Sequence, residues 1–323
     1  MNTFDMKDVG KKGTIVVTGQ SKLSLSISIC MLQAGYEVLL WAGDADTVKK
    51  QFEQQLAVVS TTGAVSVAGE KLQVVSKLEK TDCALAIAIT DEKLNDKTSI
   101  IAQLEAQLPA DAWIGVNTES IALDEIQEGS RNPERIIGLN WVEPAYTTFF
   151  LEIIANQKNN STALEKLVQE AKASWNKDPY VVHDAISVRS RLFCAMAREA
   201  FFLIENGYAT VQDIDRACRN DAGYYLPFAG NFRYMDLMGT HSYAEVMKKL
   251  NADLATGSHP PQMLREIIAD GGLGMENNKG FYSYKNGDTS DWERLFTKFS
   301  FQIQEIIEKY PFNYDDKQPI TDN

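Results

Sequence analysis

Gly19, Ser21 and Ser24 occupy the three positions of a G-x-G-x-x-G spacing, in which only the first glycine is kept. The turn follows a β-branched run that begins at Thr14. Glycines at the second and third positions let the backbone approach a dinucleotide pyrophosphate and let the next helix pack on the strand. Serine is the smallest polar substitute, and its hydroxyl can donate to a phosphate at a helix N-terminus. We therefore expect this turn, with Gln20, to bind a nucleotide cofactor.

The end of the next apolar run bears on the ribose of such a cofactor. A carboxylate that binds the ribose hydroxyls is expected there, about 20 residues after the first glycine. The run ends at Trp41 and Ala42, and the alanine side chain cannot accept a hydrogen bond. Asp46 is expected to be the N-cap of the following helix. This leaves Asp44 as the candidate ribose partner, with Trp41 and the later Asn117 beside the cofactor.

Short apolar runs alternate with helical periodicity from Thr14 to about Glu152, as βαβ units require. The predicted strands are 14–17, 38–41, 72–75, 84–89, 113–116 and 136–139, and the predicted helices between them are 22–34, 45–59 and 95–108. This pattern predicts an α/β fold with a mainly parallel, doubly wound, Rossmann-type sheet over residues 1–183. After that point the pattern becomes helical, so we expect a second, all-α domain over 184–323.

Composition limits the classes of partner. Forty-four acidic and 32 basic residues give a formal charge of −12, which argues against nucleic acid as a partner. No stretch is apolar enough to cross a membrane, and the start of the chain is polar, so we expect a cytoplasmic protein. The cysteines have no C-x-x-C spacing, which favours buried free thiols over a metal site or a disulfide. These cysteines are Cys30, Cys83, Cys194 and Cys218.

Several local strings resemble the 3-hydroxyacyl-CoA dehydrogenase family in order and spacing. They are Asn117-Thr118, the run from Gly138 to Pro144, the run from Leu151 to Ile154, Glu205-Asn206-Gly207 before Asp213, and the run from Gly280 to Tyr284. The resemblance covers nearly the whole chain. It implies a Rossmann-type domain that binds NAD and a helical domain that forms a homodimer interface. It also implies an oxidoreductase acting on a 3-hydroxyacyl thioester, such as an acyl-CoA, or a related 3-hydroxy acid.

The resemblance also places the catalytic residues. In the family a histidine is the acid/base, and a glutamate twelve residues later orients it. Here the histidine position is Asn140 and the glutamate position is Glu152, while the family's asparagine and its substrate-side serine fall on Ser190 and Glu119. Asparagine cannot take up the alcohol proton, and loss of a general base typically costs about 10² to 10⁴ in rate. The expected function is therefore an oxidoreductase that is impaired or inactive in the family reaction.

Several alternatives stay open. Asn140 and Ser190 could form a polar pair that binds a substrate carbonyl, or a satisfied buried contact without a ligand. Glu119 and Glu152 could converge with Glu143 in a rebuilt carboxylate site. No metal site is predicted, because such sites usually also recruit histidine. A family glutamate near the cofactor falls at or near Asp91.

At the level of the whole protein, the alternative to a divergent oxidoreductase is a non-catalytic ligand-binding or scaffold protein that keeps the fold and the dimer. The aromatic-rich segment from Gly223 to Asp236 fits either a ligand pocket or a dimer interface. Binding of NADH is the property that separates the two functions.

Overall fold

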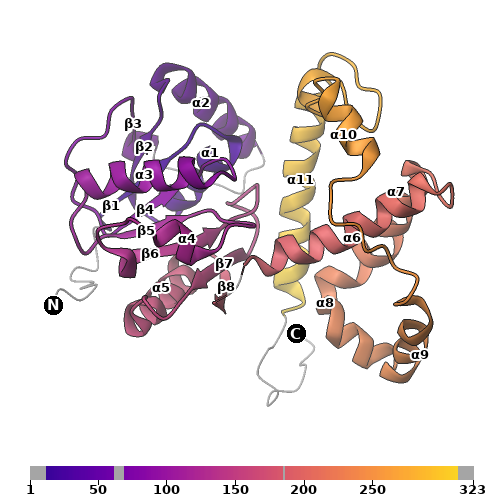
Figure 1. Cartoon of the computed structure of the whole chain (residues 1–323). Helices are drawn as coiled ribbons and strands as arrows, with labels where there is room; N and C mark the ends of the chain where they lie inside the picture. The colour runs from indigo at the N-terminus through magenta and orange to yellow at the C-terminus, as the bar shows by residue number, and fades with distance from the viewer. Residues whose placement is uncertain (1–11, 62–68, 185, 312–323) are drawn as a thin grey trace. The chain divides into compact units, whose positions relative to one another are not determined.

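The computed structural model describes residues 12–61, 69–184 and 186–311. The chain forms two compact units that divide between Arg191 and Leu192 (Figure 1). This division lies inside helix α6 (Val188–Glu205), whereas the sequence pattern placed the boundary between 183 and 184.

The first unit contains an eight-stranded sheet with the order β3-β2-β1-β4-β5-β6-β7-β8. All neighbouring strands are parallel except β6 and β7, which are antiparallel. The strands are β1 (Thr14–Thr18), β2 (Glu37–Trp41), β3 (Leu72–Val75), β4 (Leu85–Ala88), β5 (Trp113–Val116), β6 (Ile136–Asn140), β7 (Phe150–Ala155) and β8 (Asp178–His183). The predicted doubly wound, Rossmann-type sheet is therefore confirmed. Its chain order reverses between β1 and β4, where such sheets bind ligands at the carboxyl ends of their strands.

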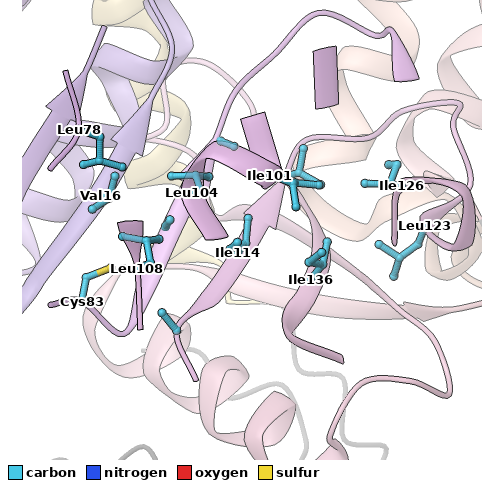
Figure 2. Close-up of a cluster of buried hydrophobic side chains, with 14 of the residues drawn as sticks. Val16, Leu78, Cys83, Ile101, Leu104, Leu108, Ile114, Leu123, Ile126 and Ile136 are labelled. Carbon is cyan, nitrogen blue, oxygen red and sulfur yellow. The ribbon is translucent and has the colours of Figure 1, made fainter. Parts of the chain in front are cut away.

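Helices cover both faces of this sheet. They are α1 (Lys22–Gln33), α2 (Ala45–Thr61), α3 (Leu94–Gln107), α4 (Leu123–Gln127) and α5 (Ser161–Ser174), with short 3₁₀ turns η1 (Gly69–Lys71) and η2 (Pro133–Arg135). On one face, α3 and α4 pack on the central strands through a buried cluster that includes Leu104, Ile114 and Ile126 (Figure 2). Because β4 and β5 are buried along their whole length, their residues form continuous apolar runs.

Two glycines let the strands that lead to the site lie close together. A Cβ on Gly115 of β5 would meet Leu139 Cδ2 at 2.7 Å, and a Cβ on Gly138 of β6 would meet Thr118 Cγ2 at 2.9 Å. Both distances are shorter than real Cβ contacts, so larger residues would push β5 and β6 apart. Gly138 therefore brings the end of β6 against Thr118, just beyond β5.

The second unit is helical, which confirms the expected all-α C-terminal part. Beyond α6 it contains α7 (Val211–Ala217), a π-helical turn η3 (Cys218–Ala222), α8 (Gly223–Met238), α9 (Thr240–Leu250), α10 (Gln262–Ala269), the 3₁₀ turn η4 (Met275–Asn277) and α11 (Asp288–Lys309). In the part of this unit that the structure describes, the buried side chains are confined to Ala229, Thr297 and Ser300. Large apolar side chains are exposed instead, among them Tyr224 at 81% and Phe232 at 79%.

The cysteines divide between the two units. Cys30 and Cys83 are buried free thiols in the first unit, as expected. Cys194 and Cys218 are free but exposed, so the prediction of buried thiols was wrong for these two. They lie on α6 and η3, where the apolar periodicity does not lead to burial in this chain. Within the described residues, no helix is both long and apolar enough to cross a bilayer.

Candidate active site

The site centres on Asn140 at the end of β6. Its side chain is 1% exposed and lies opposite Glu152 in the antiparallel register of β6 and β7. Asn140 Nδ2 donates to Glu152 Oε2 at 2.8 Å and to the carbonyl oxygen of Thr118 at 2.7 Å. Asn140 Oδ1 accepts from the Thr118 N–H at 2.7 Å. The Asn140 carboxamide therefore links the backbone of Thr118, beyond β5, to the side chain of Glu152 on β7.

This geometry distinguishes the two readings of Asn140. A carboxamide has two N–H donors, and here Thr118 and Glu152 take both. No donor remains for a substrate carbonyl or for Ser190. The backbone N–H of Ser190 donates to Ser187 Oγ at 3.1 Å as part of the first turn of α6. Asn140 thus forms a satisfied buried contact, and the structure shows no Asn140–Ser190 pair.

Glu152 is fully buried, and its other oxygen holds the start of α6. Oε1 accepts from Tyr180 Oη at 2.8 Å and from the backbone N–H groups of Val188 at 2.9 Å and Arg189 at 3.3 Å. A carboxylate is favourable here because helix N-termini present free N–H groups and positive potential. Burial alone would raise the pKa of Glu152, but hydrogen bonds from Ser187, Asn140, Tyr180 and Arg189 outweigh it and lower the pKa. Glu152 is therefore a held carboxylate with its acceptor sites occupied.

A second bonded carboxylate lies near Asp91, where the resemblance placed a family glutamate. Asp91 itself is 76% exposed and pairs with Lys93. Its neighbour Glu92, with 29% of its side chain exposed, contacts buried groups instead. Glu92 Oε2 lies 2.9 Å from Nζ of the fully buried Lys97, which also donates to the carbonyl oxygen of Asn117 at 2.6 Å. A lysine on an otherwise buried face of α3 was the sequence signal for this pair.

Glu92 also joins two neighbouring loops. Its Oε1 accepts backbone N–H bonds from Glu119 at 2.9 Å, Ser120 at 2.7 Å and Ile121 at 3.2 Å. Desolvation would raise the pKa of Glu92, but the N–H donors and Lys97 together lower it. The loop after β4 is thereby fixed to the loop after β5.

Glu119 differs from both of these carboxylates. Its side chain is 33% exposed and contacts Arg189 Nη1 with Oε1 at 3.3 Å and Oε2 at 3.5 Å. Arg189 lies over the ring of Phe150, with 6.0 Å between the guanidinium carbon and the ring centroid. Burial raises the pKa of Glu119, and the nearby charges of Glu92 and Glu152 add to this against the effect of Arg189. Glu119 is thus a partly exposed carboxylate that is protonated more readily than an ordinary glutamate, because its pKa is raised.

Two of the three carboxylates that could form a rebuilt site contact the same residue, Arg189, through different groups. Glu119 contacts the guanidinium of Arg189 and Glu152 accepts its backbone N–H. Over the described ranges, no group of three or more His, Cys, Asp or Glu side chains is arranged to hold a metal ion. The Glu143–Pro144 peptide bond that follows β6 is cis.

The turn after β1 keeps the form of a phosphate-binding turn. Gly19 has a φ of +135°, and a Cβ there would meet the carbonyl oxygen of Ile89 at 2.9 Å. Ser21 is the N-cap of α1, because its Oγ accepts from the Ser24 N–H at 3.3 Å. The Ser24 hydroxyl is buried and donates to the carbonyl oxygen of Ser21 at 2.7 Å. Gln20 and Ser21 are exposed beside the helix N-terminus, whereas the Ser24 hydroxyl is already engaged inside the helix.

The structure corrects the residue expected to cap the helix after β2. Asp44 Oδ1 accepts from the Thr47 N–H at 3.1 Å, so Asp44, rather than Asp46, caps α2. Asp46 lies in the first turn of that helix. Hydrogen bonds from the Thr47 side chain and from its backbone N–H lower the pKa of the exposed Asp44. Trp41 is partly buried, and its Nε1 donates to the carbonyl oxygen of Ser76 at 3.3 Å.

Asn117 binds the neighbouring strand end rather than pointing freely outward. Its Oδ1 accepts from the Thr90 N–H at 2.8 Å, and its Nδ2 donates to the Thr90 carbonyl oxygen at 2.9 Å. The loops after β1, β4 and β5 are therefore adjacent at the carboxyl edge of the sheet. A helix N-terminus behind a close-packed glycine turn fits a pyrophosphate. The end of β2 fits a ribose less well, because its nearest carboxylate caps a helix.

Comparison with protein families gives two matches along the chain. Residues 14–185 match the model of the 3-hydroxyacyl-CoA dehydrogenase NAD-binding domain. Residues 188–284 match the model of the C-terminal domain of the same family.

Individual relatives and solved structures agree with these matches. The chain is 26% identical over 280 residues to a 3-hydroxybutyryl-CoA dehydrogenase from Bradyrhizobium diazoefficiens, covering 83% of this chain and 94% of the relative. It is 24% identical over 226 residues to the 5-formyl-3-hydroxy-2-methylpyridine 4-carboxylate 5-dehydrogenase of Mesorhizobium japonicum, covering 69% and 73%. A crystal structure of a dehydrogenase for the same pyridine carboxylate, described as an NAD⁺-dependent dismutase, has a TM-score of 0.82 at 20% identity and covers 91% of this chain and 98% of that one. This structural likeness shows the fold.

Proposed function

The chain belongs to the 3-hydroxyacyl-CoA dehydrogenase family, and from this premise we propose that it binds NAD(H) and acts, with impaired turnover, on a 3-hydroxyacyl thioester or related 3-hydroxy acid. The observation that carries the proposal is the Asn140 carboxamide. It occupies the position that the resemblance gives to the acid/base, and both of its N–H donors are already bonded.

The cofactor half of the proposal rests on the turn after β1. Gly19 leaves room for a close backbone approach, and the exposed Gln20 and Ser21 lie where a helix N-terminus attracts phosphate. We assign the pyrophosphate to these residues and the nicotinamide side to the edge near Asn117. A bound nicotinamide would exchange a hydride with the carbinol carbon of the substrate. The rest of the chemistry is a proton transfer that the protein must provide.

Impairment follows from that proton transfer. An amide is neither a base nor an acid near neutral pH, so Asn140 cannot exchange a proton with the substrate oxygen. Glu152 cannot take its place without giving up the bonds that hold α6 and Asn140. We therefore expect turnover about 10² to 10⁴ below that of an enzyme with a histidine at this position.

The apolar surface of the second unit supports a homodimer. Large apolar side chains are exposed on α6 and α8, including Leu192, Phe193, Phe228 and Phe232, and exposed apolar surface of this kind is typical of protein interfaces. A second copy of the chain would bury them. We also propose a cytoplasmic location, which the free state of the described cysteines supports.

The second candidate function is a non-catalytic ligand-binding or scaffold protein. Ser24 and the capping role of Asp44 favour it, because both weaken the cofactor site relative to a glycine-rich turn with a free ribose carboxylate. In that case the fold, the dimer and the Asn140–Glu152 contact remain for structural reasons alone.

A titration of the purified protein with NADH tests the proposal. NADH fluorescence and thermal stability are followed together, because a ligand that binds the native state raises its stability by mass action. Saturable binding near the micromolar range, on the order of −8 kcal/mol, is the expected result. No fluorescence change and no stabilisation at millimolar NADH would contradict the cofactor assignment and favour the non-catalytic candidate. Turnover is then measured with NADH and a 3-oxoacyl thioester.

A further inference from the structure

The carboxylates at the carboxyl edge of the sheet are not equivalent, and their difference bears on the missing proton acceptor. Glu152 accepts bonds from Asn140, Tyr180 and the first N–H groups of α6. Glu92 accepts three backbone N–H bonds and pairs with the buried Lys97. Protonation of either one would break several of these bonds. Neither carboxylate is suited to accept and release a proton during turnover.

Glu119 has a different environment. Its carboxylate makes two long contacts to a single arginine nitrogen, and one third of its side chain is exposed. It can therefore gain a proton at the cost of one ion pair on a partly solvated surface, where such pairs are weak. Its exposed side gives the proton a path to and from water.

The position of Glu119 is set by the fold. It lies three residues beyond the end of β5, and Glu92 accepts from its backbone N–H, which holds this loop beside the end of β4. The next residue after β4, Ile89, is packed against Gly19 of the turn after β1. Ligands of doubly wound sheets bind at these strand ends, where the chain order reverses. Glu119 thus lies on the ligand-binding edge, next to Thr118 and its partner Asn140.

We propose that the Glu119 carboxylate is the proton acceptor for the substrate hydroxyl, in place of the imidazole that Asn140 does not provide. This inference rests on the proposed function. In the oxidation direction, the substrate O–H bond breaks and its proton passes to a carboxylate oxygen of Glu119. The carbinol C–H bond breaks and its electron pair leaves as a hydride to oxidised nicotinamide, so that a C=O bond forms and the dinucleotide is reduced. Glu119 then returns its proton to water.

The charges around Glu119 suit this role. Arg189 from α6 and Lys97 from α3 favour the ionised form, while Glu92 from the loop after β4 and Glu152 from β7 oppose it. Together with burial, the negative neighbours raise the pKa of Glu119 above that of an ordinary glutamate. A carboxyl with a raised pKa is a stronger base for an alcohol proton. Arg189 is a positioning residue in this scheme, because it holds the carboxylate and tunes its proton affinity.

The test compares Glu119→Gln with Glu119→Asp, and uses Asp124→Asn as a matched control. Asp124 is an exposed carboxylate on α4 that pairs with Lys158 at 2.9 Å and accepts from Asn156 Nδ2 at 2.9 Å. The first readout is the pH dependence of kcat/KM with NADH and acetoacetyl-CoA. We expect Glu119→Gln to lower kcat/KM by about 10² to 10⁴ and to remove the limb that reports the carboxyl. Glu119→Asp should keep this limb of the pH profile and lose less of kcat/KM. Asp124→Asn should keep both the limb and the kcat/KM of the parent protein.

The second readout needs no turnover. Infrared difference spectra against Glu119→Gln isolate the C=O stretching band of the protonated Glu119 carboxyl as pH is lowered. We expect its midpoint to lie above the ordinary glutamate range, and Arg189→Gln to move it higher still, because a neighbouring cation is lost. An ordinary midpoint that Arg189→Gln leaves unchanged would overturn the proposal. So would loss of the kinetic limb in Glu143→Gln rather than in Glu119→Gln.

The outcomes separate this inference from the proposed function. Failure of NADH to bind contradicts the proposed function itself. Binding of NADH with no measurable turnover in the parent protein keeps only the cofactor half of the proposed function and overturns the role of Glu119. Equal turnover in the parent and Glu119→Gln leaves the proposed function in place and overturns the role of Glu119 alone. A carboxyl midpoint in the raised range together with a large loss in Glu119→Gln is the supporting result.

Discussion

Asn140 Nδ2 and Glu152 Oε2 are joined at 2.8 Å across the antiparallel pair β6–β7, and the same two side chains also fix the backbone beyond β5 and the start of α6. The pair therefore supports three elements at once. Its contribution to folding can be separated from any contribution to chemistry, because the first is present in the apo protein.

Asn140→Ala should destabilise the protein. It leaves the buried N–H and C=O groups of Thr118 without their partner and removes one donor from Glu152. We expect a loss of about 2–4 kcal/mol in the free energy of unfolding, measured by urea denaturation. Asn95→Ala, an exposed asparagine on α3, is the control and should cost far less. Equal stability of the two variants would show that the hydrogen bonds of the Asn140 amide do not stabilise the fold.

Asn140→His should increase turnover. A histidine at this position could donate to Glu152 Oε2 and exchange a proton with the substrate oxygen, which the amide cannot do. We expect a gain of at least about tenfold in kcat/KM with NADH and acetoacetyl-CoA, toward the 10² to 10⁴ attributed to a general base. Asn140→Ala provides the same position without a base and should show no gain. A histidine variant that folds, binds NADH and gains nothing would count against the impairment argument.

Glu152 should make stability depend on pH at the acid end. Its folded pKa is lowered, so the carboxylate contributes stability that is fully present above the unfolded pKa, near 4.5, and is lost as pH falls through the folded pKa. Glu152→Gln should therefore lose stability at neutral pH, by at least about 2 kcal/mol, and show a flatter acid limb. Unfolding is monitored by circular dichroism between neutral and acid pH, which gives the stability at neutral pH and the steepness of the acid limb. An acid limb as steep as that of the parent protein would assign the dependence to other carboxylates.

Gly19→Ala should abolish NADH binding. A Cβ at this position would meet the Ile89 carbonyl oxygen at 2.9 Å, and φ is +135°. Gly129→Ala is a matched control, because Gly129 also has a positive φ, of +81°, but nothing lies within 4 Å of its added Cβ. Both variants should lose about 1–3 kcal/mol to backbone strain, and Gly19→Ala should lose more through the clash. NADH affinity, measured by fluorescence, should fall in Gly19→Ala alone.

The end of β2 should discriminate poorly between NADH and NADPH. Asp44, which follows this strand end, caps α2 and is not held toward a ribose hydroxyl. We expect dissociation constants within about tenfold of each other, equivalent to about 1.4 kcal/mol. Asp44→Ala should lower the melting temperature through loss of the cap and leave the ratio of the two constants unchanged. A strong preference for NADH that disappears in Asp44→Ala would show that Asp44 does bind the ribose.

Sequence reasoning reached the fold, but not the bonding of the candidate site residues. Strand periodicity predicted a mainly parallel, doubly wound sheet, because parallel strands buried on both faces form continuous apolar runs. Spacing alone could not show that Ser24 turns its hydroxyl into α1 or that Asp44 and not Asp46 is the cap, since both depend on side-chain rotation. The family glutamate was placed only at or near Asp91, because spacing alone does not show which of the neighbouring carboxylates is bonded, whereas the structure pairs Glu92 with the buried Lys97.

The hold of Glu152 on α6 also determines which parts of this protein can be exchanged. The N–H groups of Val188 and Arg189 belong to a helix that continues into the second unit, yet they complete a buried carboxylate of the first. A chimera that joined this sheet to another helical unit at residue 183 would replace those donors with whatever the new segment offers. A crossover beyond Arg191 would carry them along. The first turn of α6 must therefore be kept together with the sheet when the helical unit is exchanged.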